Sequence, residues 1–142
     1  MQMFIIGSVL ETAKILDKKR LNKQIVECYQ ILNALNGSTK AWRNHPCTIQ
    51  YQEHIEYIKN YILCLESYKN NDLILASKYN DICEKLKPSF HNIEYFNQMK
   101  RRLYTKNKEH YSQFAYLGES QINWYYVDNQ WKYYLNGKVV KK

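Results

Sequence analysis

One helical segment brings together side chains that could hold a phosphate-bearing substrate. Between residues 16 and 35, charged and amide side chains recur at three- and four-residue steps along one helix face: Asp17, Arg20, Gln24 and Glu27, with Lys23 beside them. Acids and bases arranged in this way could converge on one ligand, with the cations binding phosphate. A second interpretation needs no ligand, because the same residues could form ion pairs that tie helices together: Asp17 with Arg20, and Lys23 with Glu27.

Two further basic segments could contact an anion. The loop of residues 42–46 leads into a predicted helix, and helix starts bind anions through free amides; Arg43 and His45 are its candidate contacts. Residues 91–115 mix Lys and Arg with aromatic side chains, a combination that suits phosphates and unstacked bases. The alternative in both segments is packing, since loop histidines often only form hydrogen bonds and aromatic residues of amphipathic helices often belong to the core.

The elements that would position these residues are mostly helices. The chain has 4 Gly and 2 Pro among 142 residues, which favours long helices over a fold with many turns. Apolar periodicity predicts helices over about 9–18, 18–36, 47–68 and 72–87, and one or two more within 91–115. Dense aromatic residues around a short polar turn predict a β-hairpin over about 122–140. We therefore expect a mainly α fold, a compact single-domain helical bundle over residues 1–118 with an aromatic hairpin extension over residues 119–142.

Composition limits the possible partners. The net charge of +8 favours an anionic partner, most commonly nucleic acid for a small basic domain, although a Lys-rich chain can also simply be soluble. No two of the four cysteines have the spacing of a zinc or redox pair, so we expect reduced thiols, no metal and no cofactor. The apolar start is broken by Gly7 and no segment is long enough to span a membrane. The expected location is cytoplasmic or nuclear, and the expected state is a monomer.

Three stretches resemble the pyrimidine-dimer DNA glycosylase (endonuclease V) family. They are LDKKRLNKQIVECYQILNAL (residues 16–35), KAWRNHP (40–46), and Arg102-Leu103-x-x-Lys106 followed by EHY (109–111). The resemblance covers about residues 1–114 and is most specific in the N-terminal half. It implies a compact all-α domain that binds damaged or abasic double-stranded DNA. It also implies attack on the sugar C1′ by an N-terminal α-amine, a Schiff base, and backbone cleavage assisted by a glutamate.

The resemblance also assigns roles to residues of this chain. The nucleophile would be the α-amine of Met1, which is retained because Gln2 is too large for methionine removal. An α-amine is partly neutral near pH 7, as such a nucleophile must be. Gln24 stands where the family has its catalytic glutamate, and Glu27, one turn further along the helix, could replace it. The resemblance also implies DNA contacts at Lys23, His91, Arg102 and Lys106, which join Arg20, Arg43 and His45 as the candidate DNA-binding residues.

Three functions follow from the sequence. The first is a DNA repair glycosylase with abasic-site lyase activity, with Met1, Gln24 and Glu27 as its catalytic residues. The second is a non-catalytic protein that binds DNA or DNA damage on the same fold, with Gln24 marking the lost chemistry. The third is a structural or interaction protein whose mixed-charge helix face is an internal network of ion pairs.

Overall fold

The computed structural model describes residues 1–135 and 138–140. The described elements follow one another along the chain as α1 (Val9–Ile15), α2 (Lys18–Leu35), α3 (Pro46–Gln50), α4 (Ile55–Lys69), α5 (Leu73–Leu86), α6 (Ile93–Lys106), the 3-10 helix η1 (Ser112–Leu117), β1 (Asn123–Val127), β2 (Gln130–Leu135) and β3 (Lys138–Val140). The predicted mainly α fold with a small C-terminal β element is confirmed. Among the described helices, none is long and apolar enough to cross a membrane.

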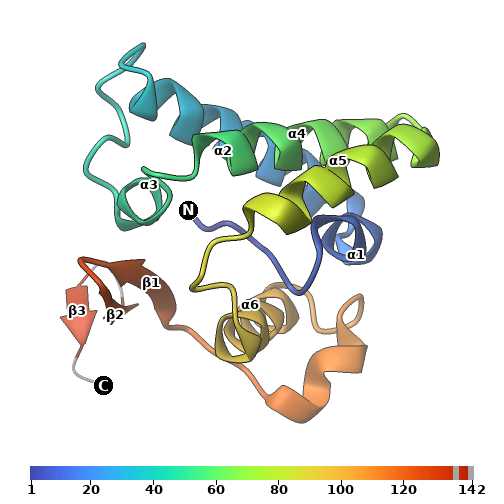
Figure 1. The fold of residues 1–142 in the computed structure, drawn as a ribbon. Coiled ribbons are helices and arrows are strands. Elements are labelled where there is room, and N and C mark those ends of the chain that lie inside the picture. Colours follow the sequence, from blue (N-terminus) through green and yellow to red (C-terminus); the bar gives the residue numbers. More distant parts are fainter. Residues whose placement is uncertain (136–137, 141–142) are drawn as a thin grey trace.

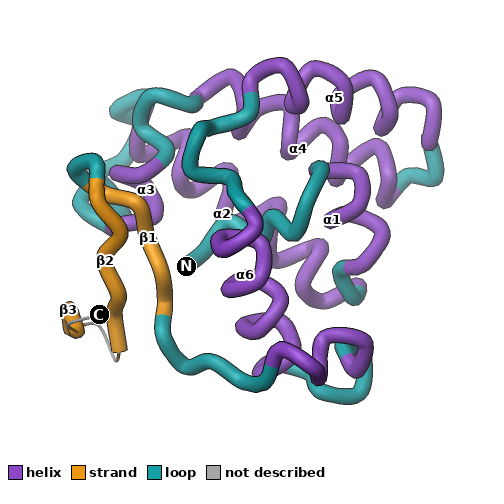
Figure 2. The backbone as a smooth tube through the Cα atoms, turned by 60° about the horizontal axis from the view of Figure 1, so that its bottom comes forward, coloured by secondary structure: helices purple, strands orange, loops and turns teal. Residues whose placement is uncertain are grey.

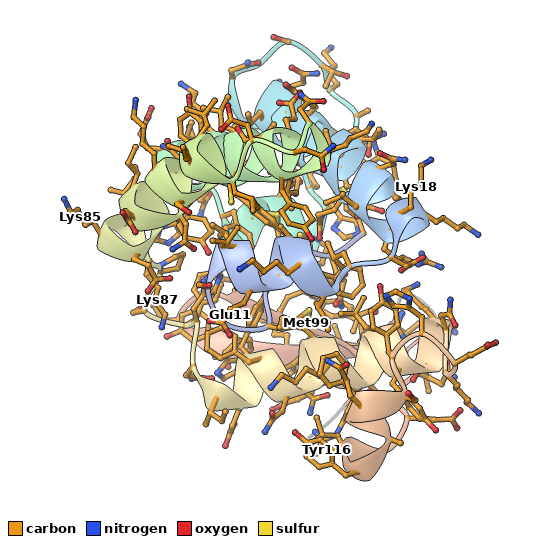
Figure 3. All side chains as sticks on the ribbon, turned by 90° about the vertical axis from the view of Figure 1, so that its right-hand side faces the viewer. Glu11, Lys18, Lys85, Lys87, Met99 and Tyr116 are labelled. Atoms are coloured by element: carbon orange, nitrogen blue, oxygen red, sulfur yellow. The ribbon has the colours of Figure 1, made fainter. Side chains whose placement is uncertain are left out.

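The N-terminal segment, defined here as residues 1–6, lies between two groups of helices. Helices α1, α2, α4 and α5 pack together on one side of it, and α6 with η1 lies on the other (Figure 1). Met3, Phe4 and Ile5 are buried in the core. Figure 3 shows Met99 of α6 on the side that faces α1, whereas Tyr116 of η1 points outward. The start of the chain therefore lies inside the fold.

Local sequence signals set several helix boundaries. Ser8 and Glu11 form a capping box at the start of α1, because each side chain accepts a hydrogen bond from the other residue's backbone N–H. At the start of α5, the Asp72 side chain accepts from the Leu75 N–H at 3.0 Å. The helix that precedes Gly37 ends at Leu35, and Gly37 adopts a positive φ of 82°. The predicted starts of α1 and α5 and the predicted end of α2 are confirmed to within about one residue.

The helix predicted over residues 47–68 is broken into two. Helix α3 ends at Gln50, residues 51–54 form a turn, and α4 begins at Ile55. Tyr51 at the break is fully buried, and its hydroxyl lies 2.6 Å from His91 Nε2 and 3.1 Å from the Tyr95 hydroxyl. These contacts join residues 40 or more positions apart, so no local pattern could predict the break.

The C-terminal residues form a three-stranded antiparallel sheet in the order β1-β2-β3, beside α3 and the N-terminus (Figure 2). The predicted hairpin turn is present at Asp128 and Asn129, which have φ values of 55° and 60° as a two-residue primed turn requires. Positions 136–137 and 141–142 of the predicted extension lie outside the described residues. Trp124 and Tyr125 of β1 are buried in the main core, so the sheet shares one core with the helices.

Candidate functional site

A pocket of about 70 Å³ opens where the N-terminal segment, α2, α6 and the start of β1 meet. Its lining contains all three residues predicted to be catalytic, Met1, Gln24 and Glu27. Four of the predicted DNA contacts also line it: Arg20, Lys23, Arg102 and Lys106. The structure thus brings the charged face of α2 next to Arg102 and Lys106, which belong to the basic segment predicted at residues 91–115.

Side chains from several elements hold the N-terminal segment in place. The segment belongs to no sheet, so its buried backbone groups need other partners. The Tyr125 hydroxyl donates to the Met1 carbonyl at 2.6 Å, Tyr95 to the Met3 carbonyl at 2.7 Å, and Tyr61 to the Phe4 carbonyl at 2.6 Å. The Ile6 N–H donates to Thr12 Oγ1 at 3.1 Å. These anchors fix where the first residue of the chain lies.

The Gln24 amide also anchors the segment, because it accepts one hydrogen bond from the segment's backbone and donates another to it. Its Oε1 accepts from the Phe4 N–H at 2.6 Å, and its Nε2 donates to the Gln2 carbonyl at 3.0 Å. Only 1% of Gln24 is exposed. An ionised glutamate accepts but cannot donate, so it could not make both bonds. The structure therefore gives Gln24 a positioning role in place of the predicted catalytic one.

Glu27 supplies the carboxylate of the pocket. Its side chain is 13% exposed, and Oε2 accepts from the Gln2 N–H at 3.3 Å, one peptide bond away from the Met1 α-carbon. Oε1 lies 3.9 Å from Lys23 Nζ. Glu27 therefore lines the pocket and also contacts the backbone of Gln2, the residue next to Met1.

The cations outnumber the single carboxylate of the pocket lining. Arg102 is fixed by a 3.0 Å hydrogen bond from Nη1 to the Ser120 carbonyl, and its pKa is lowered mainly by burial. The pKa of Lys106 is lowered to about 8, first by partial burial and then by the positive charges of Arg102, Arg20 and Lys23, with Glu27 opposing the shift. An anion such as a DNA phosphate would relieve this repulsion, so the pocket is electrostatically suited to one.

Two predicted DNA contacts, Arg43 and His45, do not line the pocket. Arg43 is exposed in the loop before α3. His45 is the N-cap of α3, and its Nδ1 accepts from the Cys47 N–H at 3.1 Å. Its pKa falls to about 4, first through burial and then through the charge of the N-terminal amine, so His45 is neutral near pH 7 and lies within the field of that amine. Its present role is structural, because its accepting nitrogen caps the helix.

His91 does not reach the pocket, contrary to its predicted role as a DNA contact. It is 4% exposed, lies among Tyr51, Tyr57 and Tyr95, and bonds to the Tyr51 hydroxyl. Burial lowers its pKa to about 3. A neutral side chain enclosed by aromatic rings cannot bind phosphate, so the prediction is corrected to a core residue.

Two residues of the C-terminal strand belong to the site, although the sequence did not indicate them. Asn123 lines the pocket, and its Oδ1 accepts from Gln2 Nε2 at 3.0 Å. Tyr125, two residues later on the same face of β1, bonds to Met1. Alternation along the predicted strand could have grouped these two side chains on one face. It could not have indicated that this face meets the chain's first residues.

The proposed internal ion-pair network is present only in part. Lys23 and Glu27 form a pair at 3.9 Å, but Asp17 accepts a hydrogen bond from the Tyr111 hydroxyl and, within the described residues, forms no ion pair with Arg20. Lys23 is 55% exposed, so this pair contributes little to stability. Among the described residues, no cluster of three His, Cys, Asp or Glu side chains could hold a metal ion.

Comparison with known families bears on the N-terminal half of the chain. Residues 1–67 match the model of a family described as pyrimidine dimer DNA glycosylase. This part holds the N-terminal segment and helices α1 to α3 with most of α4, and therefore includes Met1, Arg20, Lys23, Gln24 and Glu27. No curated protein and no solved structure matches the chain. The predicted resemblance to the pyrimidine dimer DNA glycosylase family is thus confirmed over residues 1–67.

Proposed function

We propose that this protein is a DNA glycosylase with abasic-site lyase activity that acts on damaged double-stranded DNA. The observation that carries the proposal is the composition of the pocket, which gathers the first residue of the chain, the carboxylate of Glu27 and four cationic side chains. The family match over residues 1–67 supports a role in the repair of pyrimidine dimers or related lesions.

The proposed reaction uses these groups in order. The α-amine of Met1 attacks C1′ of the damaged nucleotide and displaces the base, or adds to the aldehyde of an abasic site and releases water. Both routes give an imine at C1′; on the first route the C1′–O4′ bond of the sugar ring breaks as the imine forms, and O4′ takes up a proton. Glu27 then removes the C2′ proton, and the 3′ phosphate leaves in a β-elimination. Arg20, Lys23, Arg102 and Lys106 hold the flanking phosphates while the nucleotide is out of the duplex.

The lyase step asks less of the site than the glycosylase step. An abasic site already carries an aldehyde at C1′, so the amine has to reach only the sugar and no base has to be displaced. We therefore expect abasic duplexes to react faster than duplexes that still carry the damaged base.

Borohydride trapping tests the proposal directly. The protein is incubated with duplex DNA that contains one abasic site, and borohydride reduces any imine to a stable covalent adduct. We expect an adduct with the abasic duplex and none with the same duplex without a lesion. Salt-sensitive binding to the abasic duplex without an adduct would refute the lyase mechanism.

A non-catalytic protein that binds DNA damage is the second candidate. The observation that favours it is Gln24, which the resemblance aligns with a catalytic glutamate and whose buried amide bonds to the Phe4 N–H and the Gln2 carbonyl. The same cations would then bind phosphates without any reaction. This candidate predicts that affinity falls steeply with salt, at about one unit of log-log slope per phosphate contact, while no adduct forms.

A further inference from the structure

The pocket contains a second amine that could react with the substrate. Lys106 is the last residue of α6, and its side chain lines the same pocket of about 70 Å³ as Met1 and Glu27. Met1 and Lys106 line the same pocket, so a sugar bound in it would lie beside both residues. The resemblance assigned Lys106 only to phosphate binding, and the family match ends at residue 67, well before it.

The groups around Lys106 favour its neutral form. Arg102 lies one helical turn earlier on α6, and its bond to the Ser120 carbonyl keeps it in place. Arg20 and Lys23 face Lys106 from α2, Met1 shares the pocket from the N-terminal segment, and Glu27 is the one carboxylate among the lining residues. Crowding by cations is a known way to activate a lysine for Schiff-base chemistry, because it penalises the ammonium form.

The consequence for reactivity is large. With a pKa of about 8, roughly one Lys106 side chain in ten is neutral at pH 7. For an ordinary lysine with a pKa of about 10.4, the neutral fraction is roughly 250-fold smaller. Phosphates bound to Arg20 and Arg102 offset part of this difference, so the pH dependence must be measured with DNA bound.

We propose that Lys106 Nζ is a second Schiff-base amine of this pocket. It adds to the C1′ aldehyde of the ring-opened abasic site and loses water to form an imine. Glu27 removes the C2′ proton, the electrons of that C–H bond form the C2′–C3′ double bond, and the 3′ phosphate leaves with the C3′–O bonding pair. Hydrolysis of the imine returns the amine. This inference rests on the lyase reaction proposed above.

Peptide mapping of the wild-type adduct gives the first test. The borohydride-trapped protein is digested, and the peptide that carries the sugar remnant is identified by mass spectrometry. We expect adduct on the peptide that contains Lys106, alone or together with adduct on Met1. Adduct only on Met1 would overturn the inference and leave the lyase function intact, whereas no adduct at all would refute the lyase function itself.

A set of variants gives the second test. The α-amine is blocked by an N-terminal acetyltransferase that does not modify lysine side chains, because chemical acetylation would also modify a lysine with a pKa of about 8. Retention of the fold is checked by thermal unfolding. We expect the blocked wild type and a blocked Lys69→Arg control to keep the adduct. Blocked Lys106→Arg should form at least tenfold less adduct. Lys69 is the matched control because it is an exposed lysine that likewise ends a helix, α4. An adduct that persists in blocked Lys106→Arg would contradict the assignment.

The pH profile separates a nucleophile from a phosphate contact. For the blocked wild type with saturating abasic DNA, the trapping rate should rise with pH and level off once the pH exceeds the pKa of Lys106, which is about 8 before bound phosphates raise it. Lys106→Arg keeps the positive charge, so its DNA affinity and salt dependence should stay within twofold of wild type while trapping is lost. A parallel loss of affinity and trapping would indicate a phosphate contact only and would overturn the inference.

Discussion

Replacement of Gln24 by glutamate would test whether the buried amide holds the N-terminal segment. The introduced carboxyl group could still accept from the Phe4 N–H, which lies 2.6 Å from Oε1. Its second oxygen would face the Gln2 carbonyl at the position from which the amide nitrogen now donates at 3.0 Å. Only the protonated acid can donate there, so the folded state should raise the pKa of the new group by several units.

The size of the effect follows from this linkage. In the unfolded chain, the carboxyl group titrates at about 4.3, and each unit by which folding raises its pKa costs about 1.4 kcal/mol at neutral pH. Between the two pKa values the folded state binds more protons than the unfolded state, so stability falls as pH rises. We expect the free energy of unfolding of Gln24→Glu to lie within about 1 kcal/mol of the wild-type value near pH 4. By pH 7 it should be lower than the wild-type value by roughly 4 kcal/mol.

Urea denaturation at several pH values between 4 and 7.5 measures this difference. Tryptophan fluorescence reports unfolding, and each variant is compared with wild type at the same pH. Gln30→Glu is the matched control because Gln30 lies on the same helix with a partly exposed side chain. The difference in free energy of unfolding between Gln30→Glu and wild type should change little with pH. A flat difference for Gln24→Glu as well would refute the idea that the Gln24 amide bonds anchor the segment.

Three further predictions concern the pocket and the core. Glu27→Gln should keep an acceptor for the Gln2 N–H, which now lies 3.3 Å from Oε2, and should slow β-elimination by about 10²- to 10⁴-fold in a gel cleavage assay, while borohydride trapping continues; unchanged cleavage would exclude Glu27 as the base. Arg102→Ala should weaken binding to abasic duplex and reduce the log-log salt slope by about 1, measured by fluorescence anisotropy; an unchanged slope would exclude a phosphate contact. His91, with a pKa of about 3 in the fold, should make the free energy of unfolding fall as pH drops from about 6.5 towards 3, because the unfolded chain binds the extra proton. His91→Gln should reduce that slope in acid denaturation, and an identical slope would assign the acid sensitivity to other groups.

The local features of this protein could be predicted from its sequence. The capping box at Ser8 and Glu11 and the cap at Asp72 depend on residues three positions apart, so the sequence pattern contains all the information needed. The same holds for Arg20, Lys23 and Glu27, whose helical spacing places them beside the buried stripe. These residues do line one pocket, as their pattern indicated.

Gln24 shows how a local pattern can be misread. It lies three residues after Leu21 and four before Cys28, both of which are buried, so its spacing belongs to the apolar stripe. Its polarity instead suggested membership of the charged face. The structure resolves this because the buried amide has two backbone partners, and both come from the N-terminal segment rather than from the helix itself.

By itself, the sequence determined most of the helices, the surplus of positive charge and the resemblance of residues 1–67 to a known family, because each depends on residue types or short spacings. Only the tertiary structure decided where the first residue lies. The N-terminal segment has no regular hydrogen-bonding pattern of its own, so packing selects its partners, and one of them, Tyr125, is 124 positions from Met1. Packing likewise brought Arg102 and Lys106 to Glu27 and placed His91 in the core. Contacts over such separations depend on how all the elements pack together, and no local pattern encodes them.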